Sequence, residues 1–172
     1  MQRHDRAATR LRRRIGQSLR LGGGLMLVGW LSGCSVATPF RFADDFKDTA
    51  ADCETVTVAV THARYNPSLR TRDVFWSYVG SVEETLATQP GFVGYSKRRQ
   101  VFGNEAWTMS VWVDEEHMAR FVDGDAHLSA IHEAAWTMRD AAFARLTVAC
   151  DELPLAWPRA LELLAAEGRS YR

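Results

Sequence analysis

The sequence is poor in the features that define several common protein classes. Its longest apolar stretch, Leu21–Leu31, is interrupted by glycines and is shorter than the ~20 residues of a membrane-spanning helix. After residue 33 the only basic cluster, Lys97–Arg99, is too short for a nucleic-acid interface. No cysteine has a histidine at a spacing typical of a catalytic thiol. With 47% hydrophobic and 24% charged residues, the chain has instead the composition of an ordinary globular protein.

The charge balance divides the chain near residue 33. Residues 1–33 hold seven arginines and one acid, whereas the whole chain has 21 basic and 21 acidic residues, so the remainder is acidic by about six charges. A basic segment followed by a short apolar stretch predicts a cleaved signal peptide. We therefore expect an exported domain with no general attraction for nucleic acid.

A lipid-anchoring site is predicted where this leader ends. Leu31-Ser32-Gly33-Cys34 resembles the lipobox of bacterial lipoproteins, in which the cysteine is lipidated and becomes the new N-terminus. Several acyl chains on Cys34 would hold the protein far more firmly than one. The expected location is the cell envelope, with the domain anchored to the inner or outer membrane outside the cytoplasm. The alternative is an ordinary signal peptide, with Cys34 there by chance.

The rest of the chain is expected to contain a tether (34–54), one domain (55–150) and a tail with a short helix (151–172). Residues 34–54 show no sustained periodicity beyond one short turn of structure. Elsewhere the spacing of apolar residues predicts regular elements. These are a strand over 55–61, a helix over 71–86, strands over 92–101 and 105–113, a helix from 114 that breaks at Gly124 and resumes over 127–140, a strand over 143–150 and a helix over 158–167.

The order β-α-β-β-α-β is that of the ferredoxin-like α+β fold. Right-handed crossovers place both helices on one face of a four-stranded antiparallel sheet, in the spatial order fourth, first, third, second strand. The first and fourth strands are then antiparallel neighbours, which brings Cys53 close to Cys150. An oxidising compartment favours a disulfide between them, and two separate buried thiols are the alternative.

The two faces of this sheet differ in polarity. The more apolar face, expected to pack under the helices, carries Val56, Val58, Val60, His62, Trp107, Met109, Val111 and Val113. The other face carries Thr55, Thr57, Ala59, Thr61, Thr108, Ser110, Trp112, Arg145 and Thr147. Because this second face is too apolar for comfortable exposure, two copies are expected to cover it by forming a symmetric homodimer.

The domain resembles the antibiotic biosynthesis monooxygenase-like superfamily, the dimeric α+β barrels. The resemblance rests on three segments, namely Gln89-Pro90-Gly91-Phe92, Trp107–Trp112 followed by Asp114-Glu115, and Phe121 followed by His127-Leu128-Ser129. It implies the fold more strongly than an activity, because such relatives include cofactor-free oxygenases, haem-degrading enzymes, isomerases and members with no known reaction.

The resemblance also implies a pocket between the sheet and the helices. The candidate catalytic residues are His127, His62 and His132, and the candidate pocket residues are Trp107, Met109, Trp136 and Trp76. His127 stands where the family motif often has histidine, although it is equally suited to capping the segment after Gly124. Because His127 and His132 are ~140° apart around a helix, they do not form a zinc site, and no metal is expected.

The implied reaction needs little from the protein. A cofactor-free oxygenase binds an electron-rich phenol or enol, a base removes a proton, and the resulting carbanion reduces oxygen itself. Haem held by a histidine is a second option, but the first strand has no asparagine where haem degraders use one. The hypotheses are therefore an exported enzyme that oxidises a small aromatic or quinol-type molecule, a non-catalytic envelope lipoprotein that binds an apolar ligand or haem, and a structural dimer.

Overall fold

A computed structural model describes residues 34–49 and 53–171. The signal peptide expected over residues 1–33 lies outside the described residues, whereas Cys34 is the first residue within them. The described residues belong to one compact unit, Leu31–Arg172. None of the helices in this described part is long and apolar enough to cross a membrane.

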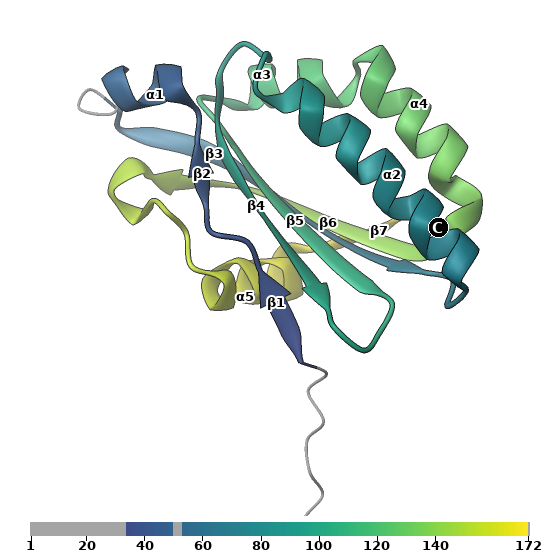
Figure 1. The fold of residues 1–172 in the computed structure, drawn as a ribbon. Coiled ribbons are helices and arrows are strands. Elements are labelled where there is room, and N and C mark those ends of the chain that lie inside the picture. Colours follow the sequence, from purple (N-terminus) through teal and green to yellow (C-terminus); the bar gives the residue numbers. More distant parts are fainter. Residues whose placement is uncertain (1–33, 50–52, 172) are drawn as a thin grey trace, which may run out of the picture. The chain divides into compact units, whose positions relative to one another are not determined.

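The centre of the molecule is an antiparallel sheet whose four long strands have the ferredoxin-like order (Figure 1). These strands are β3 (Thr55–Tyr65), β4 (Phe92–Gln100), β5 (Glu105–Trp112) and β6 (Met138–Ala149). They lie side by side in the order β4-β5-β3-β6, so the predicted topology is confirmed. Short strands extend both edges, with β1 (Ser35–Ala37) and β2 (Arg41–Phe42) paired to β4 and β7 (Arg169–Tyr171) paired to β6.

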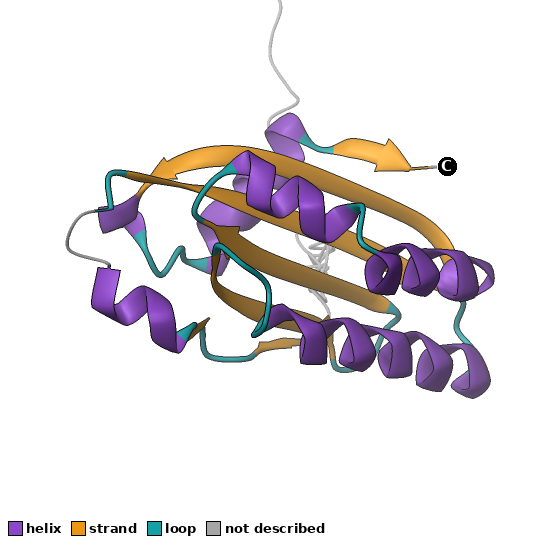
Figure 2. Ribbon diagram, turned by 90° about the horizontal axis from the view of Figure 1, so that it is seen from above, coloured by secondary structure: helices purple, strands orange, loops and turns teal. Residues whose placement is uncertain are grey.

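Helices cover both faces of the sheet. The helices α2 (Leu69–Leu86), α3 (Glu115–Val122) and α4 (Asp125–Ala134) lie on one face, and α5 (Trp157–Glu167) lies on the other (Figures 1 and 2). The remaining elements are α1 (Asp44–Thr49), η2 (Ala135–Thr137) and η3 (Cys150–Glu152). The start of α2 differs from the expected Thr71, because Ser68 is the N-cap and accepts a hydrogen bond from the Thr71 amide.

The segment expected to be a tether is part of the fold. Residues 34–49 contribute β1, β2 and α1, and both strands pair with the edge strand β4. Phe46 is buried in the main hydrophobic cluster, with Phe40 and Phe42 packed beside it. These elements were not expected because strands of two or three residues are too short to produce a recognisable period.

The two sheet faces are covered in the opposite sense to the expectation. The valine-rich face packs against α5, where Ala160 is fully buried in the same cluster as Val56, Val58 and Val60. The face with Ala59 and Thr61 lies under α2 and α4. We expected the most apolar face to lie under the crossover helices. This was wrong because α5, which follows the β-α-β-β-α-β unit, covers that face. The helices thus cover the part of the expected dimer surface around Ala59 and Thr61, whereas Thr55, Arg145 and Thr147 on the same face remain exposed.

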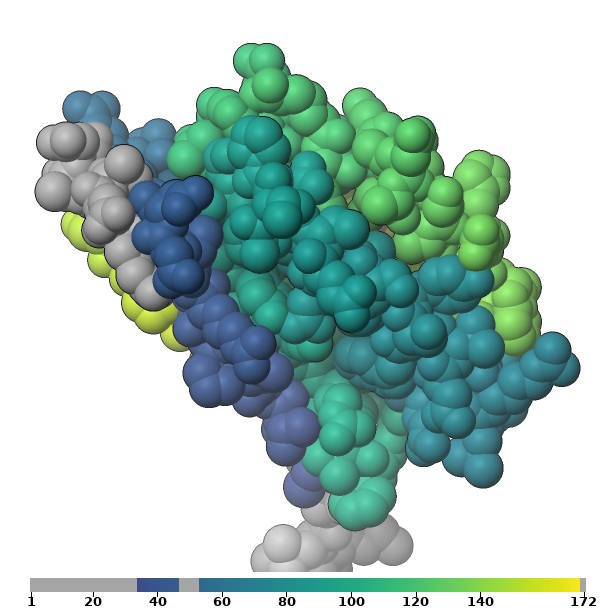
Figure 3. Space-filling view, turned by 45° about the horizontal axis from the view of Figure 1, so that its top comes forward, coloured from purple at the N-terminus to yellow at the C-terminus, as the bar shows by residue number. Residues whose placement is uncertain are grey.

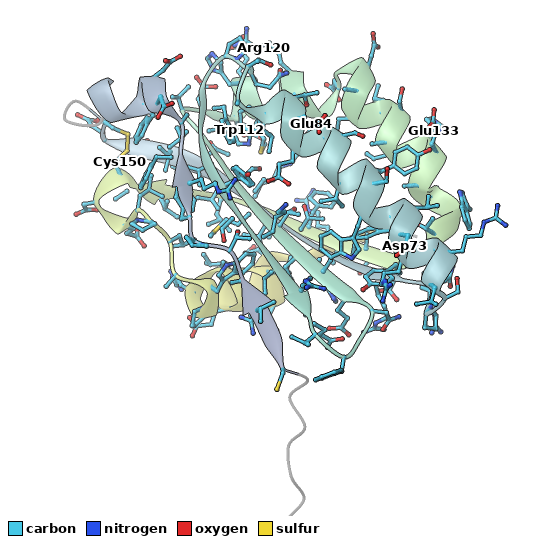
Figure 4. The ribbon with its side chains drawn as sticks, viewed as in Figure 1. Asp73, Glu84, Trp112, Arg120, Glu133 and Cys150 are labelled. Carbon is cyan, nitrogen blue, oxygen red and sulfur yellow. A yellow bond between two sulfur atoms is a disulfide. The ribbon has the colours of Figure 1, made fainter. Side chains whose placement is uncertain are left out.

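The last crossover also ends earlier than expected. The helix expected to run to Asp140 stops at Ala134, and the Thr137 hydroxyl donates to the Ala134 carbonyl at 2.6 Å. Strand β6 begins at Met138, whose partner is Tyr65 at the end of β3. At the other end of the same strand pair, Cys53 and Cys150 form a disulfide across Cα atoms 5.9 Å apart (Figure 4).

Candidate functional site

Small side chains leave a cavity between the sheet and the helices. On this face β3 carries Ala59, Thr61 and Ala63, and β5 carries Thr108 and Ser110 opposite them. These side chains are too short to fill the space below α2 and α4, which cover this side of the molecule (Figure 3). The cavity has a volume of about 240 Å³ and is partly open to solvent.

Apolar side chains from the helices form the roof of the cavity. The helix residues are Phe75, Val79, Val82, Leu86, Met118, Phe121, Val122, Ala130, Ile131 and Ala134. Met138, at the start of β6, also lines the cavity. Trp112 closes the space between sheet and helices and is fully buried (Figure 4). Tyr78 on α2 ties the two long helices together, because its hydroxyl donates to Glu133 on α4 at 2.6 Å. A mostly apolar lining with a few polar groups is the usual composition of a small-molecule site.

His127 is the histidine that lines this cavity. Its Nδ1 lies 3.0 Å from the carbonyl oxygen of Val122, and since a carbonyl only accepts, Nδ1 carries the proton. In the neutral ring the other nitrogen, Nε2, is then unprotonated and carries a lone pair. Burial lowers the pKa of His127, and the Val122 carbonyl and the Asp123 carboxylate only partly offset this. The neutral imidazole, suited to accept a proton, is thus the form present at neutral pH.

A charged cluster provides the strongest polar groups in the cavity wall. The Glu83 carboxylate on α2 accepts hydrogen bonds from the Tyr95 hydroxyl and the Lys97 ammonium, both on β4. Arg41 on β2 donates to the same Tyr95 hydroxyl at 3.3 Å. With two cations and one carboxylate, the cluster has one surplus positive charge.

The cluster is fixed in this charge state. Burial alone would raise the pKa of Glu83, but the hydrogen bonds from Lys97 and Tyr95 outweigh it and lower the pKa. Burial and the bond to Glu83 raise the pKa of Tyr95. Glu83 is therefore ionised and Tyr95 protonated across the neutral range, so neither group is poised as a base at neutral pH.

Two of the predicted site residues lie on the wrong face of the sheet. His62 and Trp107 are cross-strand partners on the face away from the cavity, with ring centroids 4.9 Å apart and nearly parallel planes. Arg98 covers the Trp107 ring at 5.7 Å, and His62 Nε2 lies 3.5 Å from the Glu105 carboxylate. His62 and Trp107 were expected in the cavity because they share a face with the valines, and that face was expected to lie under α2 and α4. In the structure the valine-rich face packs against α5 instead.

The other predicted residues are spread around the site. Met109 is buried in the main core and borders the cavity. His132 is exposed on α4, and Trp136 is half exposed beside Arg70. Trp76 packs edge-on against Phe75. Of the three histidines considered, the structure therefore places His127 alone in the cavity.

The sequence pattern alone does not reveal the charged cluster. Lys97 was considered only as part of a basic run, although Tyr95 and Lys97 stand two residues apart on a strand and so share a face. Glu83 joins them through the packing of α2, which no local pattern shows. Among residues 34–49 and 53–171, no group of three or more acidic, histidine or cysteine side chains is placed to hold a metal ion.

Comparison with protein-family models gives no match, and comparison with curated proteins gives none either. Solved structures do match the fold. A protein of Pseudomonas aeruginosa superposes with a TM-score of 0.50 at 9% identity, covering 55% of this chain and 94% of that one. A candidate antibiotic biosynthesis monooxygenase of Chloroflexus aurantiacus gives 0.44 at 14%, covering 55% and 91%. A candidate monooxygenase of Lactobacillus acidophilus gives 0.44 at 14%, but the match spans 57% of this chain and only 46% of that protein. At these identities the likeness shows the fold alone.

Proposed function

We propose that this is an exported, lipid-anchored protein whose domain binds a small aromatic molecule and oxidises it with molecular oxygen. The observation that carries the proposal is a neutral His127, with an unprotonated Nε2, in an apolar cavity. Such a base starts the reaction by removing a proton from the ligand. The sequence resemblance to antibiotic biosynthesis monooxygenases favours the same chemistry.

The substrate is a phenol or enol that carries an activated ring methylene. His127 removes one methylene proton, and the carbanion gives one electron to oxygen, so that the two radicals combine into a peroxide. His127 returns its proton to the peroxide, which becomes a hydroperoxide. Loss of the second C–H proton then forms the carbonyl as the O–O bond breaks, and the departing hydroxide takes up this second proton and leaves as water. One oxygen atom ends in the product and one in water, and the substrate supplies all the electrons.

The charged cluster supports this reaction from the cavity wall. Lys97 in the cavity wall stabilises negative charge that develops on the substrate oxygen, and Arg41, which is exposed outside the cavity, offsets the charge of Glu83. Because the Lys97–Glu83 pair is only partly exposed, solvent screens it less than a surface pair.

The size of the cavity limits the ligand. At about 240 Å³ it lies below the ~300–1,000 Å³ of pockets for drug-sized ligands, which favours a molecule of one or two rings. A haem, with four pyrrole rings in one macrocycle, does not fit this volume. We therefore base no step on haem.

Oxygen uptake with a panel of one-ring and two-ring phenols and enols that carry an activated ring methylene tests the proposal. We expect His127→Gln to lower the rate by roughly 10²–10⁴-fold, the usual contribution of a general base. His132→Gln is the matched control, because His132 is exposed on α4 and outside the cavity, and it should leave the rate unchanged. Turnover that survives His127→Gln would refute the base, and saturable binding without oxygen uptake would assign a ligand-carrying role instead.

The anchor is tested separately. Cys34 is a free, exposed thiol at the start of the described chain. Mass spectrometry of the mature protein should find an acylated N-terminal Cys34, and Cys34→Ala should abolish both the acylation and the detergent-dependent extraction.

A further inference from the structure

We propose that the end of the domain that bears Cys34 docks onto an anionic lipid bilayer through the turn between β4 and β5. This proposal deepens the lipid anchor proposed above and rests on it for the orientation of the domain. It adds a protein surface that an anchor alone does not require.

The fold holds Cys34 directly against this turn. The Val101 amide donates to the Cys34 carbonyl at 2.7 Å, and Ser35 pairs with Gln100 in the β1–β4 ladder. The Arg98 guanidinium donates to the Ser35 hydroxyl at 3.0 and 2.6 Å. Since the strand begins at the residue after Cys34, there is no slack between an acyl chain on Cys34 and the turn (Figure 1). An anchor there would bring the turn to the membrane surface.

The turn presents apolar side chains to solvent. Phe102 at its tip is 88% exposed, and Val101 and Val36 beside it are 39% and 49% exposed. Single exposed apolar residues are common on protein surfaces and carry no meaning by themselves. Here they gather at the one point that the anchor would bring to the bilayer, where burial of the Phe102 ring in the headgroup region is favourable.

A groove with basic and aromatic side chains runs up from the turn between β1 and α2. It has a volume of about 430 Å³ and is lined by Val36, Ala37, Thr38, Trp76, Lys97 and Arg99. Arg99 is exposed, whereas Lys97 is paired with Glu83. An arginine beside a tryptophan suits the phosphate and the interfacial depth of an anionic headgroup.

The distance along β4 between the groove and the turn agrees with the depth to which a protein segment enters the membrane interface. Lys97 stands three residues before Gln100 on β4, a rise of roughly 10 Å at ~3.3 Å per residue. Interfacial protein segments bury their apolar face roughly 5–10 Å deep. When the turn reaches the boundary of the acyl chains and β4 stands along the bilayer normal, the groove beside Lys97 and Arg99 would lie up to roughly 10 Å above it, at the level of the lipid phosphates.

Depth-dependent fluorescence quenching tests the docking. The full chain, processed in a bacterial envelope, is prepared with Phe102→Cys or with Val113→Cys, labelled with bimane and placed in vesicles of phosphatidylethanolamine and phosphatidylglycerol. Val113 is the matched control because it is exposed and follows the opposite end of β5. We expect acyl-chain nitroxide lipids to quench the label at position 102 but not at 113. Equal quenching at both positions, or none at 102, would overturn the docking.

The result separates this proposal from the anchor. If Cys34 carries an acyl group and position 102 stays unquenched, the anchor stands and the docking surface fails. If Cys34 carries no acyl group, the anchor fails, and quenching at 102 is then measured in the Cys34→Ala background, because the free Cys34 thiol would also take up the label. A second variant, Arg99→Gln, should weaken binding of the non-acylated chain about fivefold on phosphatidylglycerol vesicles and leave it unchanged on phosphatidylcholine vesicles. Equal loss on both lipids would refute the preference of Arg99 for an anionic headgroup.

Discussion

Removal of the disulfide between Cys53 and Cys150 is expected to remove a large part of the stability of the domain. The two cysteines are 97 residues apart, and the chain-entropy relation gives about 4–5 kcal/mol for closing a loop of that length. The Cys150 amide also donates to the Glu54 carbonyl at 3.0 Å, so the β3–β6 ladder keeps the native geometry without the cross-link. The loss therefore arises mainly from the unfolded chain, which gains freedom when the bond is absent.

The assay is guanidinium unfolding followed by far-ultraviolet circular dichroism, with and without reductant, on the wild type and on Cys53→Ala/Cys150→Ala. Since small domains are stable by only about 5–15 kcal/mol, the reduced protein should unfold at a clearly lower denaturant concentration. The slope should be somewhat steeper, because the unfolded chain without the cross-link exposes more surface. Cys34→Ala is the control, because Cys34 is free and exposed, and it should keep the wild-type stability and its response to reductant. A loss below about 1 kcal/mol on reduction would refute the chain-entropy argument.

Two further predictions concern the site and a tight turn. The acid limb of kcat/KM for oxygen uptake should lie below the ordinary histidine value of about 6.5, because burial lowers the pKa of His127, and a limb above that value would contradict the neutral base. The favourable contribution of His127 to the free energy of unfolding should be complete above about pH 6.5, the ordinary histidine pKa. It should be lost as the pH falls towards the lower pKa of His127 in the folded protein, since the unfolded chain binds the proton first. Gly91→Ala should destabilise the domain by about 2 kcal/mol or more in thermal or denaturant unfolding, because Gly91 has a φ of 72° and an added Cβ would lie 2.4 Å from the His117 ring. Pro90→Ala, at an exposed neighbour, is its control, and an equal effect of the two substitutions would refute the steric argument.

The sequence was sufficient to predict the order of the long elements. Strand β3 begins at the expected Thr55, and the hairpin turn falls between Gln100 and Glu105, where glycine and asparagine favour it. The cysteine pairing followed from the topology, because the start of β3 must face the end of β6. These features depend on local patterns and on connection rules that hold for most sheets.

The covering of the sheet was not predictable in the same way. Periodicity assigned Val60 and Thr61 to opposite faces correctly, but it does not say which face a given helix covers. That depends on α5, whose contact with the valine-rich face is a property of the folded chain. His62 and Trp107 were assigned to the cavity by the same error, and Glu83 was missed because its partners lie on a different element.

The alanines and threonines under α2 and α4 make the volume of the cavity adjustable independently of the stability of the domain. Ala59 and Thr108 are only half buried, whereas the opposite face contains the main hydrophobic cluster. Replacing one of these small residues by a larger one would change which ligand fits, while the packing of α5 would stay as it is. Substitutions that change the cavity and substitutions that change the packing of α5 thus lie on opposite faces of the sheet. Selection for a new ligand can therefore act on the cavity face without compensating changes on the other face.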